Sequence, residues 1–282
     1  MIIDFHTHTF PDKIAAAAIE KLSKLSHTRP FSDGTAAGLS ASAKAAGIDL
    51  SVILPVATNT KQVPSINGYA AKANETTDTT GLFSFGCMHP DYPEWKEELS
   101  RIASLGLKGI KLHPVYQNVD FDDPRYLRIL DRAGELGLIV ITHAGLDIGY
   151  PGVERCTPEM VLNAVKQVGA VKLVLAHMGG WRQWGKVEEL LVGQSVWIDT
   201  SFSAGNITPL DDGYYSPDDL PMLDETDFLR MIRKFGTDRV LFGTDSPWSD
   251  QKASLDLIAT LPLEKDERNA ILGGNARRLL QL

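Results

Sequence analysis

Two histidines near the start of the chain, His6 and His8, are the first residues whose spacing suggests chemistry. They lie in an apolar run over residues 1–8, and in an extended strand residues i and i+2 project from the same face. Neutral imidazole is a common ligand of Zn²⁺ and related ions. The pair is therefore a candidate for holding one metal ion, although a His-X-His pattern alone also occurs as two solvated side chains.

Other histidines and one carboxylate follow short apolar segments in the same way. They are His89, His113, His143, His177 and Asp245. A single buried histidine is usually a satisfied core residue. Several imidazoles and a carboxylate in one apolar funnel, however, would leave polar groups unpaired at a cost of about 1 to 3 kcal/mol each. A bound cation would remove that cost, so the metal hypothesis gains weight from the whole set.

Eight short segments rich in β-branched residues are the strands that must position these side chains. They cover residues 1–8, 50–56, 82–88, 107–113, 138–143, 171–177, 196–200 and 240–245. Stretches typical of helices alternate with them, including 124–136, 158–168, 182–191 and 224–235. This alternation predicts a single α/β fold, a (β/α)8 TIM barrel, in which active sites lie at the carboxyl ends of the strands. An open doubly wound sheet is disfavoured because no Gly-x-Gly-x-x-Gly follows the first strand.

The length and composition fit one domain over residues 1–282, with loop elaborations near 11–46 and 201–223 that could form lids or interface arms. The formal net charge is −8 and the charges are scattered, so neither a nucleic-acid nor a membrane partner is indicated. Two cysteines without a CxxC pattern argue against a disulfide framework or a thiolate zinc site. No leader pattern or run of ~18 apolar residues is present, and we expect a cytoplasmic protein.

Taken together and in order, the motifs resemble those of the amidohydrolase superfamily. They are DFHTH at 4–8, GIKLHP at 109–114, His143, AHMGG at 176–180, GTDSP at 243–247 and ILGGNARRLL at 271–280. More narrowly, they resemble the amidohydrolase-2 branch, which contains metal-dependent hydrolases, lactonases and decarboxylases such as aminocarboxymuconate-semialdehyde decarboxylase. The resemblance implies a TIM barrel with a divalent-metal site at the strand ends, a small-molecule substrate and a homodimer.

By residue, the resemblance assigns one ion to His6, His8, His143 and Asp245, with His177 beside it. Asp245 would also accept a proton from bound water, and His177 would polarise or protonate the reacting group. An open position on Zn²⁺ lowers the pKa of bound water to about 7. We expect Zn²⁺, with Mn²⁺ or Fe²⁺ as alternatives, because metal choice also follows availability.

Lys111 leaves the number of ions open. Binuclear members of the superfamily carry a carboxylated lysine on the fourth strand that bridges two metals, and His143 and His177 would then hold the second ion. In the other interpretation the Lys111 ammonium fixes a substrate carboxylate or pairs with a buried acid, and His113 contacts substrate or supports a ligand. We favour one ion.

Three further residues, His89, Trp181 and Arg182, are weaker candidates for substrate binding. Aromatic and guanidinium groups suit a planar carboxylated substrate, although ordinary packing or a turn accounts for each of them equally well. We expect Asp4 to form hydrogen bonds within the barrel floor, and His27 to be exposed to solvent.

Three functions are compatible with this sequence. The favoured one is metal-dependent hydrolysis of a C–O or C–N bond, in a lactone or amide, of a small carboxylated molecule. The alternative is metal-dependent, non-oxidative decarboxylation of a small aromatic or enoic acid, which would use the same ligands. The third is a non-catalytic metal-binding barrel, which the complete set of ligand-type residues disfavours.

Overall fold

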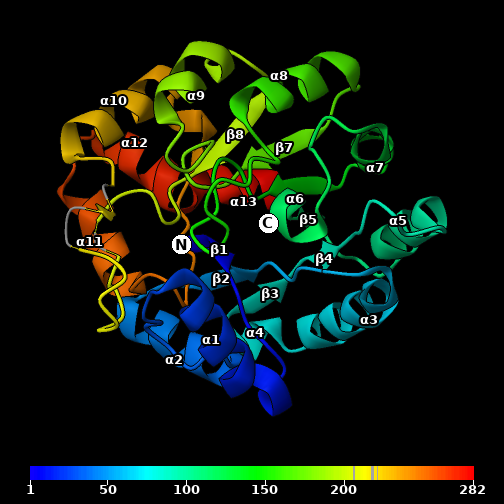
Figure 1. The fold of residues 1–282 in the computed structure, drawn as a ribbon, viewed down its shortest axis with the longest axis horizontal. Helices are drawn as coiled ribbons and strands as arrows, with labels where there is room; N and C mark the ends of the chain where they lie inside the picture. Colours follow the sequence, from blue (N-terminus) through cyan, green and yellow to red (C-terminus); the bar gives the residue numbers. More distant parts are fainter. Residues whose placement is uncertain (206, 217–218, 221) are drawn as a thin grey trace.

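The strand pairs of the computed structural model are parallel and form the wall of a barrel (Figure 1). The structure describes residues 1–205, 207–216, 219–220 and 222–282. The strands are β1 (Ile3–Thr7), β2 (Leu50–Ile53), β3 (Leu82–Ser84), β4 (Gly86–Cys87), β5 (Gly109–Leu112), β6 (Ile139–Thr142), β7 (Lys172–Leu175), β8 (Val196–Asp199) and β9 (Val240–Leu241).

Hydrogen bonds continue across both places where the ladder of strands is interrupted. Only Phe85 separates β3 from β4, and its amide donates to the carbonyl of Ile53 at 2.9 Å. β3 and β4 therefore act as one strand of the barrel. At the seam between β9 and β1, the amide of Phe5 donates to the carbonyl of Phe242 at 2.8 Å. The predicted TIM barrel is confirmed, and each of the eight predicted strands is present.

Helices surround the barrel and follow the predicted alternation. They are α1 (Asp12–Ser26), α2 (Ala36–Ala46), α3 (Val63–Asn74), α4 (Thr77–Thr80), α5 (Trp95–Ser104), α6 (Pro114–Gln117), α7 (Pro124–Glu135), α8 (Pro158–Gln167), α9 (Trp184–Leu191), α10 (Glu225–Phe235), α11 (Gln251–Thr260), α12 (Lys265–Asn269) and α13 (Asn275–Leu280), with short turns η1 (Thr60–Gln62), η3 (Thr237–Arg239) and η4 (Ala270–Gly274). None of the described helices has the length and apolar character that a membrane crossing requires.

Local chemistry explains where the predicted helices begin. The side chains of Thr157 and Asp224 accept hydrogen bonds from backbone amides in the first turns of α8 and α10, which satisfies donors that a helix start leaves free. The predicted helix at 182–191 begins two residues later, at Trp184. Arg182 has a φ of 59°, which is incompatible with a right-handed helix.

The barrel interior has an apolar floor. One buried cluster contains side chains from different strands of the barrel, among them Phe5, Phe85, Ile141, Val174 and Leu241. Side chains that come from strands around the barrel meet inside it, so the polar residues at the strand ends lie above this layer. A larger apolar cluster packs the strands against the surrounding helices.

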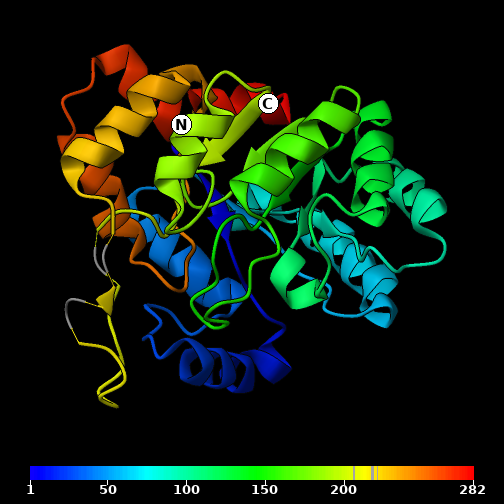
Figure 2. The same ribbon diagram turned by 45° about the horizontal axis from the view of Figure 1, so that its top comes forward.

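Long connections extend beyond the barrel (Figure 2), in the regions where the sequence predicted loop elaborations. The region near 11–46 contains α1 and α2. In the region near 201–223, residues 206, 217–218 and 221 lie outside the described part of the chain. The described segment 207–216 pairs with the segment after α1, where His27 stacks on Tyr214 at 3.7 Å and contacts Asp212 at 2.7 Å. The His27 side chain keeps 29% of its surface exposed, so the expectation that it is exposed is met only in part, because this segment packs against its ring.

Candidate metal centre

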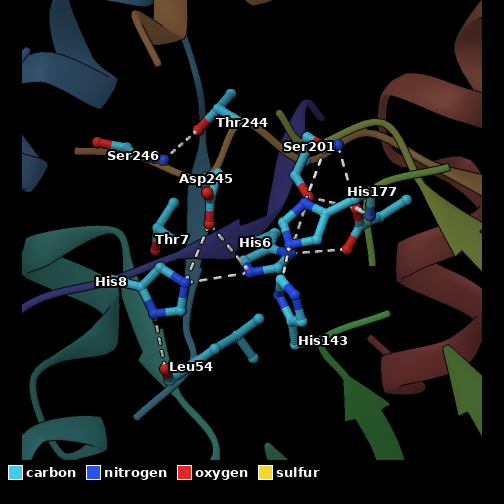
Figure 3. A network of polar contacts seen from close by, with 12 residues as sticks. His6, Thr7, His8, Leu54, His143, His177, Ser201, Thr244, Asp245 and Ser246 are labelled. Carbon is cyan, nitrogen blue, oxygen red and sulfur yellow. Dashed lines mark hydrogen bonds and ion pairs between the residues drawn. The ribbon is translucent and has the colours of Figure 1, made fainter. Parts of the chain in front are cut away.

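Three side chains converge at one point (Figure 3): His6 from β1, His8 directly after it, and Asp245 from the segment after β9. The Nε2 atoms of His6 and His8 are 3.1 Å apart, and they lie 3.2 and 3.1 Å, respectively, from Oδ1 of Asp245. Ligand atoms bound to one ion at about 2.1 Å, with angles near 90° to 110°, are separated by about 3.0 to 3.4 Å. The triangle has the size that a single divalent ion requires.

The hydrogen bonds on the other ring nitrogens fix the tautomers of both histidines. Nδ1 of His6 donates to the Asp199 carboxylate at 2.8 Å, and Nδ1 of His8 donates to the carbonyl of Leu54 at 2.9 Å. Each Nε2 therefore carries a lone pair that faces the other and an oxygen of Asp245. Three electron-rich atoms facing one another repel unless a cation lies between them, so these residues fit a divalent metal.

Burial keeps His6 in the form that binds metals. Burial and the nearby Lys111 ammonium lower the pKa of His6 to about 3, against the opposing effect of Asp199. The imidazole is therefore neutral around pH 7, and its Nε2 lone pair is free to bind an ion.

The backbone is constrained where the site is built. His177 and Asp245 have φ angles of 61° and 65°, in a left-handed region that non-glycine residues rarely occupy. The amide of Asp245 is held by the carbonyl of His6 at 2.8 Å. Next to it, a Cβ atom at Gly243 would lie 2.9 Å from Cβ of His6, so the close approach of β9 to His6 requires glycine.

Lys111, on β5, reaches the same point from the opposite side. Its Nζ lies 3.2 Å from Nε2 of His6, and the residue is buried. Burial lowers the pKa of Lys111 to about 8, although the carboxylates of Asp199 and Asp245 raise it. Lys111 therefore lies beside the triangle, and the choice between an ammonium and a carboxylated bridge stays a prediction.

His143 and His177 form a second pair beside the triangle. Nδ1 of His143 faces Nε2 of His177 at 3.1 Å. Their other nitrogens donate to the carbonyls of Leu146 and Ser201, each at 3.1 Å, so two lone pairs again face each other. The rings of His6 and His177 are 5.3 Å apart. The structure thus brings His6, His8 and Asp245 together, whereas His143 faces His177, and its assignment to the same ion stays a prediction.

His113 belongs to a separate cluster with His143 and Asp147. The rings of His113 and His143 stack with centroids 4.3 Å apart and planes 13° apart. Imidazole lone pairs lie in the ring plane, and two parallel rings do not direct them at one ion. Nδ1 of His113 also accepts from the amide of Tyr116, which leaves the proton on Nε2 and facing Asp147, at 3.6 Å. The residues could still hold an ion after a change in ring orientation, and the role of His113 in metal or substrate binding stays a prediction.

The weaker sequence candidates have structural partners. Nδ1 of His89 accepts from the amide of Asp91 at 3.2 Å. Trp181 is buried in an apolar cluster with Phe202, and the exposed Arg182 lies 5.5 Å from its ring. These contacts account for the three residues by packing, and a role in substrate binding stays a prediction.

Asp4 forms the hydrogen bonds expected of it. Its carboxylate accepts from the amide and hydroxyl of Thr244, at 3.0 and 2.6 Å, and from the side chain of Gln251 at 2.8 Å. Burial raises the pKa of Asp4 to about 7, against the opposing effect of these bonds. Asp4 thereby ties β1 to the residue that precedes Asp245.

Sequence reasoning missed Asp147, Asp199 and Ser201. Asp199 is the last residue of β8, and a polar residue at a strand end was a usable signal. Asp147 lies in a loop four residues after His143, and Ser201 becomes significant only through its contacts with Asp199 and His177. Neither of these two follows a recognisable pattern.

The chain matches known proteins along its whole length. The sequence family described as "Amidohydrolase" (Amidohydro_2) matches residues 3–282. A solved structure of 5-carboxyvanillate decarboxylase from Sphingomonas paucimobilis is 16% identical with a TM-score of 0.66, and the match covers 100% of this chain and 99% of that one. The search of curated proteins gave no match.

Two other solved structures share the fold. One is a dihydroxybenzoic acid decarboxylase from Polaromonas sp. JS666 with bound manganese, at 15% identity and a TM-score of 0.67, covering 100% of this chain and 97% of that one. The other is a protein from Pseudomonas putida described as a 2-pyrone-4,6-dicarboxylic acid hydrolase, at 19% identity and a TM-score of 0.65, covering 99% and 97%. At these identities the likeness concerns the fold.

Proposed function

The chain belongs to the amidohydrolase family, and from that premise we propose that it is a metal-dependent hydrolase of a C–O or C–N bond in a small carboxylated molecule. The observation that carries the proposal is the triangle of lone pairs on His6, His8 and Asp245, with edges of 3.1 to 3.2 Å. We take Zn²⁺ as the first ion to test and Mn²⁺ as the second.

A bound divalent ion would supply a Lewis acid and lower the pKa of a water molecule at its open position. The protein's own residues do the remaining work. The carboxylate of Asp245 accepts a proton from the attacking water. His177 is buried and presents a lone pair on Nε2. It would take that proton from Asp245 on Nε2 and release it to the leaving group.

An apolar wall beside these residues limits the access of bulk water. Trp181, Phe202 and Ile207 form a buried cluster, and the ring of Phe202 lies 6.3 Å from that of His177. A water-poor environment strengthens electrostatic interactions with the reacting groups. The same environment protects the proton that His177 takes up during the reaction from exchange with solvent.

Decarboxylation of a small aromatic or enoic acid is the second candidate. The similarity in fold to decarboxylases favours it, and the apolar wall suits a reaction that releases neutral CO₂. In this reaction Asp245 or His177 would deliver a proton to the carbon atom that loses the carboxylate. The ligands would be the same, so only the product distinguishes the two candidates.

Isotopic labelling of the product separates these reactions. Protein loaded with Zn²⁺ or Mn²⁺ is incubated in H₂¹⁸O and, separately, in D₂O with a panel of lactones, amides, 2-pyrone-4,6-dicarboxylic acid, 5-carboxyvanillate and 2,6-dihydroxybenzoate. Hydrolysis places solvent ¹⁸O in the product. Decarboxylation releases CO₂ and places deuterium on carbon. Asp245→Asn is the inactive control, and an unlabelled outcome for the whole panel, or equal rates without metal, would contradict the proposal.

A further inference from the structure

We propose that Asp199 is a positioning residue that sets the orientation of both His6 and His177, and so couples the metal ligand to the histidine that moves the proton. The inference rests on the proposed function, because it assigns roles to these two histidines. It concerns a residue that does not touch the reacting atoms.

Asp199 ends β8 and is fully buried. Its two oxygens serve different partners. Oδ2 accepts from Nδ1 of His6 at 2.8 Å. Oδ1 accepts from the amide of His177 at 3.0 Å, and from the amide and hydroxyl of Ser201 at 3.0 and 2.5 Å. One carboxylate thus receives four hydrogen bonds from three residues.

The contact with His6 determines which nitrogen faces the metal site. An ionised carboxylate accepts hydrogen bonds and donates none, so the shared proton lies on Nδ1 of His6. The lone pair then lies on Nε2, which faces His8 and Asp245. Such a contact also makes the imidazole a stronger ligand.

The contacts through Oδ1 determine the orientation of His177. The hydrogen bond from the backbone amide of His177 to Asp199 holds the backbone of His177 at a φ of 61°. The hydroxyl of Ser201 gives its proton to Asp199, so its oxygen remains an acceptor for Nδ1 of His177 at 3.0 Å. Nδ1 of His177 therefore keeps its proton, for which the carbonyl of Ser201, at 3.1 Å, is a second acceptor, and Nε2 presents a lone pair to His143. The same carboxylate fixes both rings.

The substitution Asp199→Asn tests this role with little change in volume. Its amide nitrogen can donate to Nδ1 of His6 and favour the tautomer with the proton on Nε2. We expect the affinity for Co²⁺ and Zn²⁺, measured by competition with a chelator, to fall by about 10- to 100-fold. The visible absorption spectrum of the Co²⁺-loaded protein should also change.

Ser201→Ala is the comparison variant. It removes only the Ser201 hydroxyl, which contacts Asp199 and Nδ1 of both His177 and His6. It leaves the hydrogen bonds that Asp199 accepts from Nδ1 of His6 and from the amide of His177. This variant should keep its Co²⁺ affinity and spectrum close to those of the wild type, while the pH profile of metal-saturated turnover shifts. If Asp199→Asn keeps wild-type affinity and spectrum, the proposal is overturned.

A measurement on the unaltered protein covers the case in which Asp199→Asn does not fold. The ¹⁵N shifts of imidazole nitrogens in the metal-loaded protein should show protonated Nδ1 on both His6 and His177, with His177→Gln used for assignment. Protonated Nε2 on either ring overturns the proposal. If no compound of the substrate panel reacts, the proposed function is contradicted, but the metal affinities, the Co²⁺ spectra and the ¹⁵N shifts can still be measured. The role of Asp199 and the proposed function are therefore tested independently.

Discussion

The Nε2 atoms of His6 and His8 lie 3.1 Å apart with no proton to share, because each ring has its proton on Nδ1. Both atoms also lie within 3.2 Å of an oxygen of Asp245. In the protein without metal, the ammonium of Lys111, 3.2 Å from His6, is the nearby positive charge. The arrangement of acceptor atoms is thus one that a cation stabilises.

The first prediction concerns metal content. His6→Ala and Asp245→Asn should each weaken Zn²⁺ binding by at least about 100-fold, because each removes one of three ligand atoms. Elemental analysis after equilibrium dialysis measures ions per chain. His27→Ala is the control, since His27 contacts Asp212 and Tyr214 instead. Full metal content in both ligand variants would show that the site is misassigned.

The second prediction separates His177 from the ligands. His177→Ala should keep about one ion per chain and lower turnover by about 10²- to 10⁴-fold, the usual contribution of a positioned acid or base. The measurements are elemental analysis and kcat on the substrate identified by isotopic labelling. A wild-type content of two ions that falls to one in this variant would instead support the binuclear interpretation.

The third prediction concerns Lys111. In EDTA, Lys111→Met should be less stable than the wild type by about 3 kcal/mol, because the buried carboxylates lose their cationic partner. Added Zn²⁺ should restore most of that difference. Urea unfolding with and without Zn²⁺ measures both effects. Equal stability of the two proteins in EDTA would mean that the Lys111 charge does not stabilise the buried carboxylates. If the wild type holds two ions and Lys111→Met holds one, Lys111 would be identified as a carboxylated bridge.

The fourth prediction concerns pH and stability at Asp123, which begins α7 and is away from the metal site. Hydrogen bonds from Arg125 lower the pKa of Asp123 to about 2, against a small opposing effect of burial. A lowered carboxyl pKa stabilises the fold above the unfolded value near 3.8, and this stabilisation is lost as the pH falls from there towards 2.

Asp123→Asn should therefore be less stable at pH 7 by at most about 1 kcal/mol, since asparagine still caps a helix and the ion pair is largely exposed. Urea unfolding at pH 7, 5 and 3.5 should show a difference that is constant above pH 5 and narrows at pH 3.5. A difference that widens on acidification would contradict this assignment.

The sequence was sufficient to predict the strands, because periodicity reveals where a parallel strand ends. The resemblance to the amidohydrolase superfamily singled out His6, His8 and Asp245, which the structure brings together. It did not show that His143 turns towards His177. That orientation depends on the carbonyl of Leu146, in the loop after β6, and loop geometry leaves no periodic signal. Asp199 was missed for a related reason: its role depends on His6, 193 residues away in sequence.

The triangle joins residues that the ribosome makes at widely separated times. His8 and Asp245 are 237 residues apart in the chain, and the seam between β1 and β9 brings them together. A nascent chain carries the imidazoles of His6 and His8 while more than 200 further residues are added, before the carboxylate of Asp245 is made. The triangle is therefore complete only after β9 and the residues that follow it have been made, and a chain that ends before β9 has an open barrel and lacks Asp245.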